Sequence, residues 1–247
     1  MSRSKPPPRV YLPDDIPAHG VCVVPPEQSH HVSHVLRLAA GDAVTAFDGR
    51  GNEYAATIAR ISKQGVTLNV GEPHAVSRES TLDIVLAQGI SSGDRMDYTV
   101  QKAVELGVRA IQPLATERSV VRLAPERAAR RAAHWRGIAV AACEQCGRNV
   151  VPEVLPLAAF TAWLGTRAPG ELRLTLMPGA EARLSDLERP QGRIVLLAGP
   201  EGGLSPRERG DAQIAGFTPV RLGPRVLRTE TAALAAVAAM QTLWGDF

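Results

Sequence analysis

The stretch that decides the fold is the glycine-rich turn Gly199-Pro200-Glu201-Gly202-Gly203. It follows residues 193–198, a short apolar run that is typical of a buried parallel strand. It precedes Ser205 and Pro206, which suit the N-cap and the first turn of a helix. The turn therefore joins the carboxyl end of a strand to a helix. That is where open α/β sheets bind their ligands.

Two well-known glycine loops do not fit this stretch. A P-loop has Lys and then Ser or Thr after its last glycine, whereas Leu204 and Ser205 follow Gly203, and Glu201 would repel a phosphate. A dinucleotide-binding fingerprint has the spacing G-x-G-x-x-G and opens the first βαβ unit, whereas this turn has another spacing and lies late in the chain. The alternatives left are a plain tight turn and a site for a nucleoside-like ligand that carries positive charge.

A second loop of the same kind follows shortly afterwards. Residues 218–222 resemble another short strand, and residues 222–228, LGPRVLR, lead from it into a helix that begins at about Thr229. Thr229 is a suitable N-cap, and Glu230 complements the positive end of the helix dipole. Two strand-end loops this close in sequence predict one shared pocket.

The two loops resemble those of the bacterial RsmE family, the 16S ribosomal RNA uridine-N3 methyltransferases of the SPOUT class. Three more stretches match in the same order, namely QKAVELGV at 101–108, ERSVV at 117–121 and EQCGR at 144–148. The amino-terminal third matches mainly through HHVSHVLR at residues 30–37. The resemblance implies an α/β fold with a SPOUT-type parallel sheet and a C-terminal trefoil knot, preceded by a small PUA-like β-barrel domain.

Composition limits the class of protein. A chain of 247 residues that is 45% apolar is long enough to bury a real core, and its aromatic content of 4% disfavours a surface of stacked aromatic side chains. The net charge of +3, carried mostly by arginine, is compatible with RNA. No apolar run is long enough for a membrane span. Three cysteines are too few for a disulfide scaffold, so we expect a cytoplasmic protein.

The pattern of short strands and helices divides the chain into two domains and a linker. Residues 1–72 contain β-like segments around one predicted helix at 28–38, and the resemblance implies a PUA-like RNA-binding barrel. Residues 73–80 are a polar, turn-rich linker. Residues 81–247 alternate strands with helices, which predicts a parallel α/β sheet, and the resemblance implies the SPOUT methyltransferase domain. Predicted strands of the two domains lie at 21–24, 42–47, 54–61, 66–70, 82–87, 108–114, 172–176, 193–198 and 218–222. Predicted helices of the second domain include 92–107, with Asp94 as cap and Gly107 as stop, 125–147 and 230–244.

The methyl donor that the resemblance implies is S-adenosylmethionine. A tight glycine turn offers backbone groups to its adenine and admits it without a Cβ clash. We expect the donor to contact both loops and the end of an earlier strand. The residues predicted to bind it are Leu176, Pro178, Gly199, Pro200, Glu201, Gly202, Gly203, Leu222, Gly223, Val226, Leu227, Thr231 and Ala232. For the leucines, an ordinary place in the core is the alternative.

The reaction implied is methyl transfer to N3 of a uridine. That nitrogen is a weakly acidic imide, so it must lose its proton before or during attack. A general base, or a group that stabilises the developing uracil anion, is therefore needed. Arg228 is the predicted stabiliser and Glu230 the predicted catalytic carboxylate, with Glu201 as another proton acceptor. A helix acid without catalytic role is the alternative for Glu230.

Basic side chains supply the predicted RNA footprint. Candidates for phosphate contacts are Arg37, Arg95, Lys102, Arg118, Arg122 and Arg148. The alternative for each of these residues is a solvated surface charge with no role in RNA binding. The resemblance implies 16S ribosomal RNA, or the 30S subunit, as the partner. It also implies a homodimer formed near the cofactor site, for which the alanine-rich last helix is the candidate surface.

No metal site is expected. Cys143 and Cys146 lack the second pair of ligands that a zinc site requires, and His30 and His34 lack the glutamate of the H-E-x-x-H motif. Two competing hypotheses stay open. One is a SPOUT enzyme that methylates another position, such as a ribose 2′-hydroxyl. The other is a non-catalytic RNA-binding protein of ribosome assembly.

Overall fold

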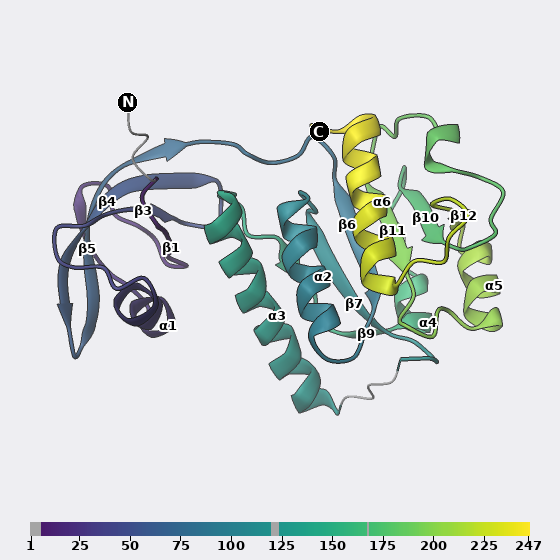
Figure 1. Ribbon diagram of the computed structural model, residues 1–247, viewed down its shortest axis with the longest axis horizontal. Helices are drawn as coiled ribbons and strands as arrows, with labels where there is room; N and C mark the ends of the chain where they lie inside the picture. Colours follow the sequence, from purple (N-terminus) through teal and green to yellow (C-terminus); the bar gives the residue numbers. More distant parts are fainter. Residues whose placement is uncertain (1–5, 120–123, 167) are drawn as a thin grey trace. The chain divides into compact units, whose positions relative to one another are not determined.

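The computed structural model describes residues 6–119, 124–166 and 168–247 (Figure 1). By its internal contacts the chain divides into two compact units. One comprises the chain up to Glu79 together with Cys143–Val151, and the other comprises Ser80–Ala142 and Pro152–Phe247. Each unit has its own sheet. The domain boundaries at residues 72 and 80 stay a prediction of the sequence.

The first unit is built on a five-stranded sheet in the order β1-β3-β4-β5-β2. β1 runs parallel to β3, and the other neighbours are antiparallel. Alternate residues of the long strands point inward, as Tyr54, Ala56 and Ile58 do in β4, and they pack in one apolar core with Val10 and Leu68. The strands are β1 (Arg9–Tyr11), β2 (Gly20–Val23), β3 (Ala43–Phe47), β4 (Asn52–Ser62) and β5 (Gly65–Ala75).

The helix of the first unit is shorter than the sequence predicts. α1 (Pro26–His30) runs directly into one turn of π-helix, η1 (His31–Val35). Arg37 then adopts a φ of 55°, in the left-handed region. That conformation does not continue a right-handed helix, so the helix stops before residue 38.

The second unit is built on a parallel sheet in the order β12-β10-β11-β6-β7-β8, with β9 also paired to β7. All of its strand pairs are parallel, which confirms the predicted sheet. β6 and β11 are buried along their whole length, as expected for central strands covered on both faces. The strands are β6 (Ile84–Gly89), β7 (Ala110–Ala115), β8 (Glu153–Val154), β9 (Ala158–Ala159), β10 (Leu172–Leu176), β11 (Ile194–Ala198) and β12 (Thr218–Val220).

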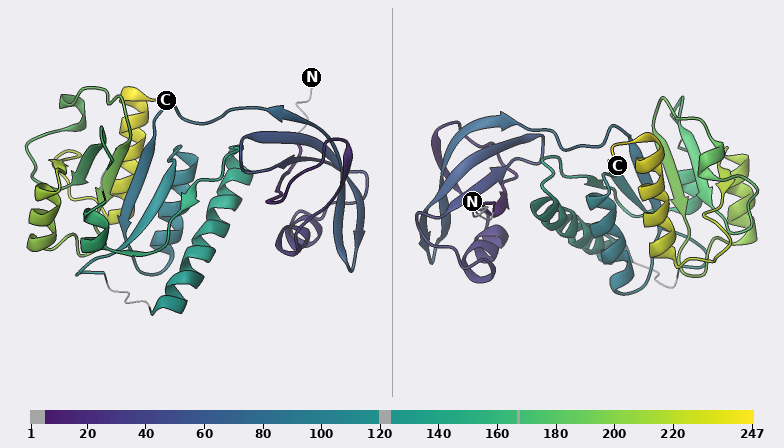
Figure 2. Two further views of the ribbon diagram at one scale, coloured as in Figure 1. Left: turned by 180° about the vertical axis from the view of Figure 1, so that it is seen from behind. Right: turned by 45° about the horizontal axis from the view of Figure 1, so that its top comes forward.

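Helices cover both faces of this sheet (Figures 1 and 2). On one face α2 and α6 pack side by side. On the other, Phe160 of α4 and Ala212 of α5 share an apolar cluster with Val195 and Leu197 of β11. The helices of the second part of the chain are α2 (Asp94–Glu105), α3 (Pro125–Cys146), α4 (Phe160–Leu164), α5 (Pro206–Ile214) and α6 (Thr229–Trp244), with a short 3₁₀ turn η2 (Leu184–Asp186).

The helix after the glycine turn begins as predicted. Ser205 is the N-cap of α5, and its side chain accepts a hydrogen bond from the backbone N–H of Glu208. The Glu208 side chain in turn accepts from the N–H of Ser205, and Pro206 occupies the first helical turn. This reciprocal capping box fixes the direction in which the chain leaves the turn.

Two other predicted caps are wrong. Asp94 is the first residue of α2, because Gly93, with a φ of 58°, is the N-cap. Thr229 is the first residue of α6, and its hydroxyl donates to the carbonyl of Gly199 instead of capping its own helix. Gly107 does end α2 as predicted, with a φ of 84°.

Candidate active site

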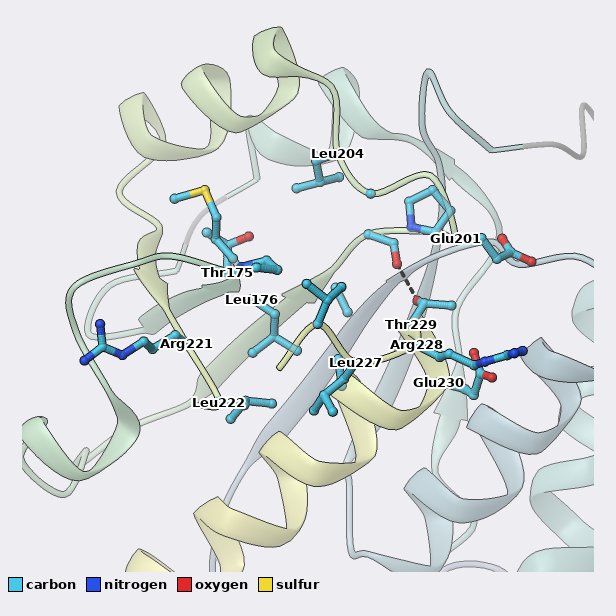
Figure 3. A pocket seen from close by; sticks show the side chains of 18 of the residues that line it. Thr175, Leu176, Glu201, Leu204, Arg221, Leu222, Leu227, Arg228, Thr229 and Glu230 are labelled. Carbon is cyan, nitrogen blue, oxygen red and sulfur yellow. Dashed lines mark hydrogen bonds between the residues drawn. The ribbon is translucent and has the colours of Figure 1, made fainter. Parts of the chain in front are cut away.

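A cavity of about 510 Å³ lies at the carboxyl ends of β10, β11 and β12 (Figure 3). Its walls come from the end of β10, the glycine turn after β11, and the loop that leads from β12 into α6. The structure thus brings the two loops together around one pocket, as the sequence predicted. All of the lining residues belong to the second unit.

All but one of the residues predicted to bind the donor line this cavity. They are Leu176, Pro178, Gly199, Pro200, Glu201, Gly202, Gly203, Leu222, Gly223, Val226, Leu227 and Ala232. The exception is Thr231, which is exposed and does not line it. Successive helical residues point in different directions, so Thr231 projects away while Glu230 and Ala232 face the pocket. The sequence missed Thr175, Arg209, Arg221 and Arg225, which line the cavity as well.

The glycines of the turn are required for different reasons. Gly203 has a φ of 65°, and its N–H donates to the carbonyl of Pro200 at 2.8 Å. A Cβ on Gly199 would lie 2.9 Å from the backbone nitrogen of Leu204. A side chain at either position would therefore open the turn.

Gly89, at the end of β6, is a requirement that the sequence did not reveal. A Cβ there would lie 2.7 Å from the backbone nitrogen of Pro200 and 3.1 Å from the carbonyl carbon of Gly199. Because Gly89 has no side chain, the glycine turn can approach the end of β6 closely. The partner lies far away in the sequence, so no local pattern marks this glycine.

Gln88 ties three segments together beside the cavity. It is fully buried, and its Nε2 donates to the carbonyls of Gly89 at 2.9 Å and Gly199 at 3.1 Å. The same nitrogen lies 3.0 Å from Oγ1 of Thr229, which itself donates to the Gly199 carbonyl at 2.5 Å. The start of α6 is therefore fastened to the glycine turn. A polar residue at the end of an apolar strand was the signal that could have found Gln88.

Glu201 is held as a carboxylate by the loop after β6. It accepts hydrogen bonds from the backbone N–H and the hydroxyl of Ser92, both at 2.8 Å, and from Arg95 at 2.9 Å. Burial acts to raise the pKa of Glu201, but these hydrogen bonds outweigh it and lower the pKa to about 2. A base that weak accepts a proton poorly at neutral pH. These contacts favour Glu230 over Glu201 as the proton acceptor.

Arg228 and Glu230 both line the cavity, on either side of Thr229 (Figure 3). Their side chains extend from the start of α6 and lie next to each other in this view. Within the part of the chain that the structure describes, the buried Oε2 of Glu230 has no hydrogen-bond partner. Buried carboxylate oxygens are normally satisfied, so this atom is free to accept a hydrogen bond from a ligand.

The basic residues predicted to contact RNA fall in different places. Arg37 is exposed on the first unit, and Lys102 is paired with Glu105 at 2.7 Å. Arg95 pairs with Glu201, and Arg118 donates to the carbonyl of Gly202 at 3.0 Å. Both of these arginines therefore contact the glycine turn. Arg122 lies outside the described residues.

Arg148 is not a surface residue, and its predicted contact with RNA is wrong. It is 3% exposed, and its Nε donates to both carboxylate oxygens of Glu79, at 3.2 and 3.1 Å. Asn149 beside it donates to Glu53, which also pairs with Arg9. A guanidinium that is buried against a carboxylate is not available to a phosphate. Arg148 instead holds the first unit together.

Cys143 and Cys146 of the C-x-x-C pair are both free cysteines. Burial raises the pKa of Cys143 to about 12, so this thiol is inert at neutral pH. No cluster of three His, Cys, Asp or Glu side chains suited to a metal ion is present among the described residues. The described helices also include none with the length and apolar character that crossing a membrane requires.

Family profiles match both parts of the chain. A profile described as an RNA methyltransferase domain matches residues 78–241, and one described as an RNA methyltransferase PUA domain matches residues 24–71. A ribosomal RNA small subunit methyltransferase E from Buchnera aphidicola subsp. Acyrthosiphon pisum is 33% identical over 97% of this chain and 95% of its own length. The protein of that name from Bacillus subtilis is 32% identical over 87% of each chain.

Solved structures agree with these matches. Ribosomal RNA small subunit methyltransferase E from Neisseria gonorrhoeae, bound to S-adenosyl methionine, has a TM-score of 0.90 and 44% identity, over 98% of this chain and 99% of its own. A methyltransferase of Legionella pneumophila in complex with the bound cofactor SAM has a TM-score of 0.93 and 39% identity, with the same coverage. The predicted α/β fold with a PUA domain and the predicted family are thereby confirmed. The chain belongs to the ribosomal RNA small subunit methyltransferase E family.

Proposed function

We propose that this protein transfers a methyl group from S-adenosylmethionine to N3 of a uridine in the 16S ribosomal RNA of the small subunit. The observation that carries the proposal is the cavity at the strand ends, which both loops of the family resemblance line. Relatives named as small-subunit ribosomal RNA methyltransferases cover nearly the whole chain, and the related structures from Neisseria gonorrhoeae and Legionella pneumophila contain the methyl donor.

The cavity fits the methyl donor in size and chemistry. Its volume of about 510 Å³ is in the range of pockets for drug-sized ligands. Apolar side chains of Leu176, Leu222 and Leu227 offer contacts to a nucleoside, and the glycine turns expose backbone groups. Apart from its chain neighbours, no described residue has an atom within 4 Å of the Cβ position of Gly223, so the loop leaves open space there.

The bound donor supplies an electrophilic methyl group, and the residues of this chain act on the uridine. We assign to Arg228 the stabilisation of the negative charge that develops on the uracil ring as N3 loses its proton. A guanidinium stays protonated and is well suited to delocalised charge. We assign to the unpartnered Oε2 of Glu230 the acceptance of that proton. Gln88 and Thr229 act indirectly, since they position the backbone that carries both side chains.

The remaining predictions from the family complete the proposal. We infer that the carboxyl-terminal segment forms a trefoil knot, and that the enzyme works in the cytoplasm as a homodimer. Support for the homodimer comes from α6, where Leu243 is exposed and several alanines are half-buried. We also propose that the PUA-like domain spans residues 1–72 and the methyltransferase domain residues 81–247, with residues 73–80 as the linker. A methylation assay with identification of the product nucleoside tests the function, and sedimentation at several concentrations tests the dimer.

A further inference from the structure

The loop after β7 is anchored next to the glycine turn by a buried carboxylate. Glu208 is 2% exposed, and its Oε1 accepts a hydrogen bond at 2.8 Å from the backbone N–H of Glu117. Its other oxygen accepts from the N–H of Ser205, directly after the turn. A buried carboxylate that joins two backbone segments is costly to disturb. The first part of this loop, at Glu117 and Arg118, is therefore held next to the turn.

Arg118 is the residue that this anchor places against the turn. Its Nη1 donates to the carbonyl of Gly202 at 3.0 Å. A Cβ on Gly202 would lie only 3.1 Å from the Cβ of Arg118, so the stem of the arginine packs on the glycine backbone. Arg118 is nevertheless exposed. The guanidinium is held by its stem and by one N–H, and it faces solvent.

Charge distinguishes Arg118 from three of the other basic residues predicted to contact RNA, and its place beside the cavity distinguishes it from the exposed Arg37 of the first unit. Arg95, Lys102 and Arg148 each form an ion pair with a glutamate. Among the described residues, Arg118 has no ion-pair partner, and its recorded acceptor is the neutral Gly202 carbonyl. A carbonyl orients a guanidinium without cancelling its charge. A guanidinium has five N–H donors, and among the described residues one of them is used, so the others can bind an anion.

We propose that Arg118 binds a backbone phosphate of the substrate RNA and so aligns the strand against the cofactor turn. This inference rests on the proposed function, because it takes RNA as the substrate. Arginine binds phosphate bidentately, and phosphate contacts set the register of a nucleic acid on a protein. Arg118 is a positioning residue in this account. Gly202 connects the two sites, because its carbonyl accepts from Arg118 and the same residue lines the cavity.

The test compares full-length Arg118→Ala and Arg118→Lys with a matched control, Arg193→Ala. Arg193 is also an exposed arginine of the second unit, and it pairs with Asp83 at the amino end of β11, away from the cavity. Binding to a 16S ribosomal RNA transcript and to 30S subunits is measured between about 50 and 200 mM salt. Calorimetry measures the affinity for S-adenosylmethionine, and gel filtration the oligomeric state.

Arg118→Ala is expected to weaken RNA binding roughly tenfold at low salt. It should also reduce the slope of log K against log salt by about 0.7 to 0.9, the loss of one phosphate contact. Arg118→Lys should keep most of the slope, because a lysine still neutralises a phosphate. Arg193→Ala should match the wild type, and donor affinity should change less than twofold in all three.

Three results would overturn the inference. An unchanged salt slope with a weaker donor affinity would show that Arg118 only supports the turn. If an Arg118 variant eluted at a different volume in gel filtration but kept the wild-type salt slope, Arg118 would lie at a contact between subunits. If the wild-type protein bound neither the 16S ribosomal RNA transcript nor the 30S subunit, RNA would be excluded as the ligand of Arg118. Methylation by the wild type is recorded in the same series, so that RNA binding without methyl transfer counts against the proposed function and not against Arg118.

Discussion

The hydroxyl of Thr229 donates a hydrogen bond of 2.5 Å to the carbonyl of Gly199, which joins the first residue of α6 to the turn after β11 (Figure 3). Gln88 donates to both partners of this bond. The two side chains assigned to chemistry, Arg228 and Glu230, flank Thr229. The position of Arg228 and Glu230 relative to the glycine turn therefore depends on this group of hydrogen bonds at the wall of the cavity.

Removing the hydroxyl of Thr229 tests this node. Thr229→Val keeps the shape but leaves the Gly199 carbonyl with one donor fewer and Gln88 with one acceptor fewer. The free energy of unfolding should fall by about 1–3 kcal/mol, the usual result of losing one partner of a buried hydrogen bond. Thr229→Ser, which keeps the hydroxyl, is the control in urea denaturation. Equal stabilities of the Val and Ser variants would contradict the role of the bond.

Arg228→Ala should separate binding from chemistry. Donor affinity, measured by calorimetry, should stay close to that of the wild type. The rate of methyl transfer at saturating RNA should fall by about 10²–10³-fold, the usual effect of removing a group that stabilises developing charge. Arg228→Lys should recover part of the rate. Unchanged turnover in the alanine variant would remove Arg228 from the mechanism.

Glu230→Gln tests the proton acceptor. The amide keeps the size of the side chain but is a far weaker base, so kcat should fall by about 10²–10⁴-fold at neutral pH. As the pH rises, solvent takes over the deprotonation of the uridine, and the deficit relative to the wild type should shrink. A deficit that stays constant across the pH series would show that Glu230 acts only through structure.

The pKa of Glu201 predicts how stability depends on pH. Hydrogen bonds from Ser92 and Arg95 lower this pKa from 4.5 to about 2. A carboxyl whose pKa is lowered by folding contributes stability above its ordinary pKa and loses it as the pH falls towards the folded value. Glu201→Gln should therefore unfold more easily than the wild type at pH 7. In urea titrations the gap should narrow between about pH 4.5 and pH 2, and a gap that does not depend on pH would contradict the ionised network.

The local part of this site was predictable from the sequence. The strand before the glycine turn is a continuous apolar run, and Ser205 and Pro206 mark the helix after it, so strand, turn and helix follow from neighbouring residues. The second loop was recognisable for the same reason, although its helix starts without the predicted cap. Strands of two residues, β8 and β9, are too short to show any periodicity and were missed.

The parts that sequence could not reveal depend on distant partners. Gln88 bonds to Gly199, which lies 111 positions later in the chain. Arg148 resembled a surface arginine because its partner, Glu79, is 69 positions away. Glu201 was considered as a base, and what disfavours that role is its hydrogen bonding to Ser92 and Arg95, which lie more than a hundred positions earlier. Chain topology, and not local pattern, decides such pairs.

The most direct test of the account is the identity of the methylated nucleoside. Purified protein, isotopically labelled S-adenosylmethionine and either 30S subunits or naked 16S ribosomal RNA are incubated, and the digested RNA is examined by mass spectrometry. The account predicts labelled 3-methyluridine, formed far more slowly in the Arg228→Ala reaction. A labelled 2′-O-methylnucleoside would leave the conclusions on the fold and the cofactor unchanged but would contradict N3 of uridine as the proposed site of transfer. No labelled product on either substrate, with donor binding intact, would contradict the assignment of 16S ribosomal RNA as the substrate.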